Sequence, residues 1–328
     1  MLTIAAGLLS GFRAALWVTG EAKSRDIDQT WHAARALFAG RNPYAEIGPG
    51  LSFDWPAYFF YPIHAPLAIA PLALVSRPVA GILFAAIASA LFVWAATGRS
   101  LAPAVVITSA SAAFAAEAVQ WSPLLGAAYG IPWLGIFLCA KPTIGAAIFV
   151  ARPSRWGVIG AVALGAVGLL LLPTWPADWL AAARHTSLVT PGGTPYLAPL
   201  LTPGGAFAAL MILRWRRPEA RLVLALACVP QTPLLYETVP LFLVPQTIIE
   251  GGILWLGSWL VALWQSLGGP YSTDLERFTT SGRAIGWLLY LPCVVFVLRR
   301  PNVGHLPAWL ESRLRALRIP PWMLGRAA

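Results

Sequence analysis

The chain has 328 residues, of which 58% are hydrophobic and only 11% are charged, and its mean hydropathy is +0.68. These values exclude a water-soluble globular domain and predict a multi-spanning membrane protein. Sixteen Trp residues, with 29 Gly and 29 Pro, favour kinked helices over a barrel. The net charge of +10 comes from basic residues at the ends of apolar runs, so it indicates the positive-inside pattern and not nucleic-acid binding.

Apolar runs follow one another along almost the whole chain. They lie near residues 2–19, 57–76, 79–97, 101–118, 121–151, 156–173, 199–213, 221–236, 238–250, 252–268 and 284–298. The sequence therefore predicts an all-α fold, a polytopic bundle of roughly ten spans with interfacial helices in an external loop. The span count between residues 98 and 151 stays open, because the run at 121–150 fits one kinked helix or two half-helices.

Basic loops predict the orientation. Arginines between residues 152 and 155, between 214 and 221, and from 299 onward are expected in the cytoplasm. The segments at 20–56, 174–198, 236–238 and 269–283 then lie outside, and the protein is expected to be multi-pass in the inner (cytoplasmic) membrane. The first run is expected to be a retained span and not a cleaved signal peptide.

We expect one integral domain over residues 1–300 and a basic cytoplasmic tail over residues 301–328. In that tail, Leu306, Leu310, Leu314 and Leu317 recur at helical spacing among arginines. This pattern is typical of a helix that lies at the membrane interface.

Acidic residues gather in the first external segment, where Glu21, Asp26, Asp28, Glu46 and Asp54 make up five of the thirteen in the chain. Apolar residues from Ile27 to Phe38 recur at the spacing of an interfacial helix. Asp26 has two compatible interpretations. It caps this helix in a capping-box-like arrangement with Gln29, or it accepts a proton from a sugar hydroxyl at the lipid–water boundary.

A helix stop and an aromatic run complete this segment. Gly40-Arg41-Asn42-Pro43-Tyr44 combines a glycine cap with a proline that prevents the helix from resuming. The run from Phe53 to Pro62 holds more aromatic side chains than a membrane anchor requires. Its functional interpretation is stacking against a sugar ring or a prenyl chain.

The order of these motifs resembles glycosyltransferase family 87, the integral-membrane mannosyltransferases of the GT-C superfamily. The segments that carry the resemblance are Asp26, Ala34, Ala36-Leu37, Gly40–Tyr44, Phe60-Tyr61-Pro62 and Pro66–Leu72. Gln120 before Ser122-Pro123, and the run Gly135–Pro142 that ends in Lys141-Pro142, are similar to two further segments of that family. Together the matching segments span roughly residues 1 to 250.

The resemblance implies a GT-C-type cell-envelope enzyme that transfers a hexose, usually mannose, with inversion on the external face. The donor would be a polyprenyl phosphate sugar, the acceptor a lipid or glycan, and the other partners membrane lipids. Asp26 occupies the place of the general base, and Asp28 is the second candidate. No cofactor besides the lipid-linked donor is implied. No metal is predicted, because His32 and His64 have no second ligand at a workable spacing.

Several residues are candidates for substrate binding. A lysine inside an apolar run is a functional hypothesis, so Lys141 is the first candidate to hold the donor phosphate, with snorkelling to the interface as the alternative. Arg184 and His185 are second candidates for phosphate contact, or belong to a plain solvated loop. Gln120 and Glu237 either line the cavity or have structural roles at helix ends. The full predicted set is His32, Arg35, Tyr44, Tyr61, Gln120, Lys141, Arg184, His185 and Glu237.

Two departures from the family pattern leave other functions open. The segment from Thr232 to Glu237 has no His, and Gln120 lacks a preceding Gly. The alternatives are a transporter or flippase of a lipid-linked substrate, and an inactive scaffold partner of a membrane glycosyltransferase.

Overall fold

The computed structural model describes residues 1–19, 25–98, 100–189, 197–267 and 274–304, together with Ser312 and Ala316. These residues are mostly helical, which confirms the all-α prediction. Strand β1 (Ile47–Gly48) pairs in parallel with β2 (Phe53–Asp54). Glu21 and most of the predicted basic tail lie outside the described residues.

The described helices are α-helices of 4 to 21 residues with 3₁₀ segments between some of them. In chain order they are α1 (Leu2–Thr19), α2 (Asp26–Phe38), α3 (Pro43–Glu46), α4 (His64–Ala68), η1 (Ala70–Leu74), α5 (Arg77–Thr97), η2 (Ala102–Thr108), α6 (Ala110–Glu117), α7 (Ser122–Ala127), η3 (Pro132–Ala140), α8 (Pro142–Ala151), α9 (Arg155–Leu171), α10 (Trp175–Val189), η4 (Pro199–Leu201), η5 (Gly205–Arg214), α11 (Pro218–Cys228), η6 (Leu235–Leu243), α12 (Ile248–Leu267), α13 (Asp274–Ile285), the π-helical turn η7 (Gly286–Tyr290) and α14 (Leu291–Leu298).

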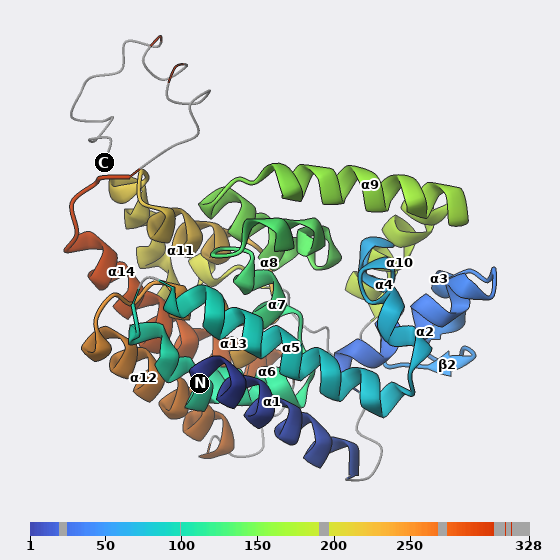
Figure 1. The fold of residues 1–328 in the computed structure, drawn as a ribbon. Helices are drawn as coiled ribbons and strands as arrows, with labels where there is room; N and C mark the ends of the chain where they lie inside the picture. Colours follow the sequence, from blue (N-terminus) through green and yellow to red (C-terminus); the bar gives the residue numbers. More distant parts are fainter. Residues whose placement is uncertain are drawn as a thin grey trace.

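The two ends of the molecule are formed by different parts of the chain. Helices α2, α3, α4 and α10 and strand β2 gather at one end, which we call the cavity end, and α14 leads to the C-terminus at the other (Figure 1). Helix α9 lies along one side of the molecule. It packs closely on η3, since a Cβ atom at Gly160 would meet the carbonyl oxygen of Ile136 at 2.3 Å.

Three of the described helices are long and apolar enough to cross a membrane: α5, α12 and the continuous helix Thr279–Leu298. A fourth crossing is obtained if α9 and α10, bent by 99°, count as one broken span. The predicted number of roughly ten is therefore not supported. Proline starts or interrupts many of the remaining apolar segments and divides them into pieces too short to cross. These prolines are Pro103, Pro123, Pro132, Pro142, Pro218 and Pro240.

The segments at 174–198 and 269–283 were expected to be external loops. In the structure much of the first is helix α10, and residues 274–283 belong to helix α13. The hydropathy window missed both helices because each carries polar side chains along its length.

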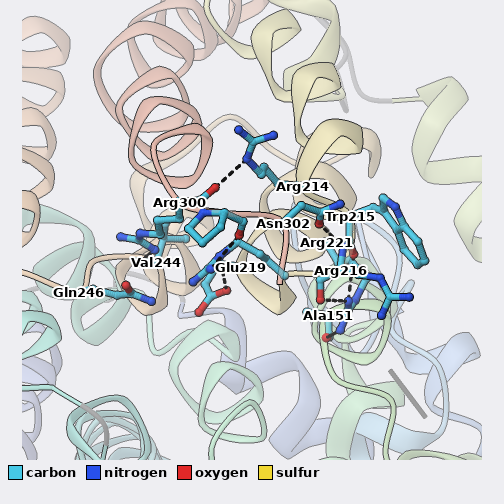
Figure 2. Close-up of polar contacts among 12 residues, drawn as sticks. Ala151, Arg214, Trp215, Arg216, Glu219, Arg221, Val244, Gln246, Arg300 and Asn302 are labelled. Carbon is cyan, nitrogen blue, oxygen red and sulfur yellow. Dashed lines mark hydrogen bonds and ion pairs between the residues drawn. The ribbon is translucent and has the colours of Figure 1, made fainter. Parts of the chain in front are cut away.

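Arginine side chains contact helix ends near α11 and α14, on the side of the molecule away from α2, α3 and α10 (Figure 1). Figure 2 shows these contacts. We call this the arginine end, defined by Arg214, Arg221 and Arg300. The Arg221 guanidinium donates to the carbonyl oxygens of Ala151 at 2.8 Å and Val150 at 3.2 Å, at the end of α8. It also donates to the carbonyl oxygens of Trp215 and Arg216 just after η5.

The other arginines at this end make the same type of contact. Arg214 donates to the carbonyl oxygens of Leu298 and Arg300 after α14, and Arg300 donates to that of Val244 after η6. The last carbonyl groups of a helix have no intrahelical partner and carry partial negative charge. The arginines therefore satisfy these groups as well as contributing to the positive charge of the loops.

Replacing Arg221 by Met should lower the free energy of unfolding by about 2–4 kcal/mol, because several carbonyl groups lose their donor at once. Thermal unfolding in detergent micelles measures this change. The exposed Arg299→Met provides the control, since it removes the same charge from the same end. Equal unfolding midpoints for the two variants would contradict the carbonyl-clamping role of Arg221.

Candidate functional site

A cavity of about 270 Å³ lies at the cavity end, and we call it the Asp26 cavity. Its walls come from the start of α2, the segment before α4, the start of α8, the helix α10 and the region from the end of α11 into η6. The lining residues are Asp26, Phe60, Tyr61, Pro62, Lys141, Pro142, Thr143, Trp179, Ala183, Gln231, Thr232, Tyr236 and Glu237. Elements far apart in the sequence therefore meet around one space.

A chain of hydrogen bonds joins four polar residues at this cavity. Gln120 Nε2 donates to Asp26 Oδ2, and Lys141 Nζ donates to Gln120 Oε1 at 3.1 Å. Lys141 Nζ also donates to Glu237 Oε1 at 2.6 Å, in an ion pair whose side chains are 13% and 4% exposed. The structure thus brings together Asp26, Gln120, Lys141 and Glu237, which the sequence singled out separately.

The two carboxylates at the start of α2, Asp26 and Asp28, have different contacts. Arg25, and not Asp26, is the N-cap residue, so the prediction that Asp26 caps the helix is wrong. Asp28 makes the capping contact, since its Oδ2 accepts from the Arg25 backbone N–H at 3.2 Å. The same carboxylate pairs with the Arg25 guanidinium at 3.1 Å. Asp28 is therefore bound in a buried ion pair and does not line the cavity, whereas the Asp26 side chain does.

The surroundings of Asp26 make it a stronger base than an ordinary carboxylate. Burial raises the pKa of the Asp26 carboxyl, because the charged form loses its hydration. The charge of Lys141 and the hydrogen bond from Gln120 act in the opposite direction, and nearby Asp28 raises the pKa further. A carboxylate with a raised pKa, located in a cavity, is a candidate proton acceptor.

Residues of the Gly40–Tyr44 motif make hydrogen bonds to elements that form the cavity wall. Buried Tyr44 donates through its hydroxyl to the carbonyl oxygen of Tyr61 at 3.0 Å. Asn42 Nδ2 donates to Asp178 Oδ2 at 2.9 Å and thereby ties α10 to the start of α3. Tyr44 lies outside the lining of the cavity, while Tyr61 belongs to it.

The remaining predicted residues also lie outside the lining. On α2, His32 stacks on Phe53 with ring centroids 3.7 Å apart, and Arg35 lies over the ring of Trp31. Burial, followed by the charge of Arg77, lowers the pKa of His32 to about 4, so this ring is neutral at physiological pH.

Arg184 and His185 are exposed on α10, next to the cavity residue Ala183. The His185 ring stacks on Tyr58 with centroids 5.1 Å apart.

Sequence reasoning missed several lining residues. Trp179 donates through Nε1 to the carbonyl oxygen of Phe60 at 2.7 Å, so this hydrogen bond joins two lining residues. The sequence gives no sign of this contact, because the segment is polar enough to predict a loop and is helix α10 in the structure. Thr143 directly follows the Lys141-Pro142 pair, and its place at the start of a helix was the available signal. Gln231 and Thr232 carry no distinctive pattern.

The arrangement is suited to proton transfer. Within the described ranges, no group of three or more His, Cys, Asp or Glu side chains is placed to hold a metal ion. A carboxylate with a raised pKa and a cation paired with a second carboxylate lie side by side. Aromatic rings of Phe60, Tyr61, Trp179 and Tyr236 supply flat apolar walls of the type that stacks on sugar rings.

No family model, curated protein or solved structure matches this chain. The resemblance to glycosyltransferase family 87 therefore stands on the sequence motifs alone. What the site can do follows from its geometry.

Removing the charge of Lys141 should raise the pKa of Asp26 further, because the ammonium favours the carboxylate form. Isotope-edited infrared titration of the Asp26 carboxyl band would measure the shift in Lys141→Met, with Asp26→Asn identifying the band. Since a lone Glu237 carboxylate could destabilise that variant, Lys141→Met combined with Glu237→Leu removes the whole pair. An unchanged or lowered pKa in both variants would contradict the described electrostatics.

Proposed function

We propose that the chain is a membrane glycosyltransferase that transfers a hexose, mannose in the family it resembles, from a polyprenyl phosphate sugar to a lipid or glycan acceptor. The observation that carries this proposal is the placement of Asp26, whose pKa is raised, in a cavity with aromatic walls and a paired cation. The sequence motifs resembling family 87 point to the same residues. The apolar helices are consistent with a lipid-linked donor.

The reaction step assigns a role to each group. The acceptor hydroxyl oxygen attacks the anomeric carbon of the sugar, and its proton passes to Asp26. The bond between that carbon and the phosphate oxygen breaks, and its electron pair leaves with the polyprenyl phosphate. Gln120 engages Asp26 Oδ2, so Oδ1 is the oxygen that receives the proton. Lys141 stabilises the charge that develops on the departing phosphate.

Asp26→Asn should reduce the transfer rate by about 10²–10⁴-fold, because the amide cannot accept the proton. Transfer of radiolabelled mannose from a polyprenyl phosphate donor to a lipid extract, in proteoliposomes, measures the rate. The variant should stay folded, since the amide oxygen of Asn can still accept from Gln120.

Asp28→Asn is the matched comparison for this experiment. It leaves the Arg25 guanidinium buried without its counter-ion, which should lower stability by about 3–5 kcal/mol. Once corrected for folded protein, its transfer rate should stay close to that of the wild type. Full activity in folded Asp26→Asn protein would remove Asp26 from the mechanism.

The transfer rate should fall with decreasing pH through the pKa of Asp26, because only the carboxylate accepts a proton. Burial raises this pKa, so the acidic limb should lie above the ordinary range of an aspartate. In the variant lacking the Lys141 charge the limb should move to still higher pH. A rate profile of kcat/KM in both proteins measures the limb, and a shift towards lower pH would contradict the assignment.

One observation favours a transporter as the second candidate function. The 99° bend between α9 and α10 has the form of a broken span, which is common around transport sites. Movement of a fluorescent prenyl phosphate sugar across proteoliposomes without transfer of the sugar would support this candidate. Transfer that depends on Asp26 would exclude it as the principal activity.

A further inference from the structure

Helix α8 begins at the wall of the Asp26 cavity. Lys141, Pro142 and Thr143 all line that wall, and Gly145 is bonded through its N–H to the carbonyl oxygen of Lys141 at 2.9 Å. Pro142 has no N–H, and the backbone N–H groups of Thr143 and Ile144 have no acceptor in the first turn of the helix. The helix dipole places partial positive charge at this end. Phosphate groups bind readily at such helix starts.

The start of α8 is also closely packed against η3. A Cβ atom at Gly145 would lie 1.9 Å from the carbonyl oxygen of Leu138, so the helix packs directly on the backbone of η3. Such close packing favours a helix start that is already formed before a ligand binds, which reduces the ordering cost of binding.

Two side chains at this helix start supply hydrogen-bond donors. Lys141 has three N–H bonds, and the structure assigns two of them to Gln120 and Glu237. Thr143 Oγ1 is buried, with no hydrogen-bond partner among the described residues. A buried hydroxyl in this position gains free energy when a ligand oxygen accepts from it.

Glu237 supplies a hydrogen-bond acceptor at the same cavity. The residue is 4% exposed, and its Oε1 is engaged by Lys141. Its Oε2 is buried without a hydrogen-bond partner in the described part of the chain. A carboxylate oxygen requires a donor and repels a phosphate, so the group that fits it is a hydroxyl.

We propose that the first turn of α8, with Lys141 and Thr143, binds the phosphate of the donor, and that Glu237 Oε2 accepts from a hydroxyl of the attached sugar. A glycosyl phosphate carries an anion and hydroxyl groups on adjacent parts of one molecule, which matches the two neighbouring binding groups. This inference rests on the proposed function and adds the orientation of the donor. It assigns Thr143 and Glu237 to two different parts of that ligand.

The test measures binding without an acceptor, so it does not depend on turnover. The two probes are a polyprenyl phosphate and the mannosylated form of the same chain length, bound to protein in lipid nanodiscs. Thr143→Val should weaken both affinities about ten-fold, because a hydrogen bond to a charged group is lost. Thr97→Val is the control, since the Thr97 hydroxyl bonds within α5 and does not line the cavity.

Glu237→Gln should act on one probe selectively. It removes the preference for the mannosylated probe, so the ratio of the two affinities should fall several-fold toward one. Plain polyprenyl phosphate should bind at least as tightly as before, because Lys141 is no longer neutralised by a carboxylate.

Unchanged affinities in folded Thr143→Val protein would overturn the phosphate site, and an unchanged ratio in Glu237→Gln would overturn the hydroxyl contact. Wild-type protein that binds neither probe would overturn both this inference and the proposed function. Wild-type protein that binds both probes with the expected variant effects, yet transfers no sugar, would support the donor site and overturn only the transferase.

Discussion

The ion pair between Lys141 and Glu237 is the interaction on which the rest of the site depends. It joins the start of α8 to η6, and both side chains are largely buried. Burying two charges is costly, and here the cost is offset by a contact of 2.6 Å and by the additional hydrogen bond from Lys141 to Gln120. Because Lys141 donates to Gln120 Oε1, the amide must direct its Nε2 toward Asp26. One ion pair thus sets the orientation of the whole chain of contacts.

Helix termini have different contacts at the two ends of the molecule. At the arginine end, Arg214, Arg221 and Arg300 cover the carbonyl groups left over by several helices. At the cavity end, the first turn of α8 lines the cavity. Helix starts attract anions and helix ends attract cations. The protein's own arginines supply the cations at these helix ends. The start of α8 instead faces the cavity.

The helical class and the four linked polar residues can be predicted from the sequence, because a charged or polar group in an apolar chain is conspicuous. The sequence does not show that these residues meet. Asp26 and Gln120 are 94 positions apart, and Lys141 and Glu237 are 96 positions apart, so their contact depends on tertiary packing. The sequence does not indicate Trp179 as a lining residue, because its segment is predicted to be a loop and is helix α10 in the structure. Thr143 becomes recognisable only from its place at the start of α8. The span count failed because hydropathy averages across prolines that divide one apolar run into short helices.

The same chain of contacts separates the roles of two nearby carboxylates. Glu237 accepts directly from the Lys141 ammonium, so its Oε1 is occupied and a proton there would break the ion pair. Asp26 is connected to that ammonium only through the neutral amide of Gln120, and burial raises its pKa. Protonating Asp26 therefore leaves the Lys141–Glu237 pair intact. In a site with two acids and one cation, the acid farther from the cation is the one that can accept a proton without losing the structure that holds it.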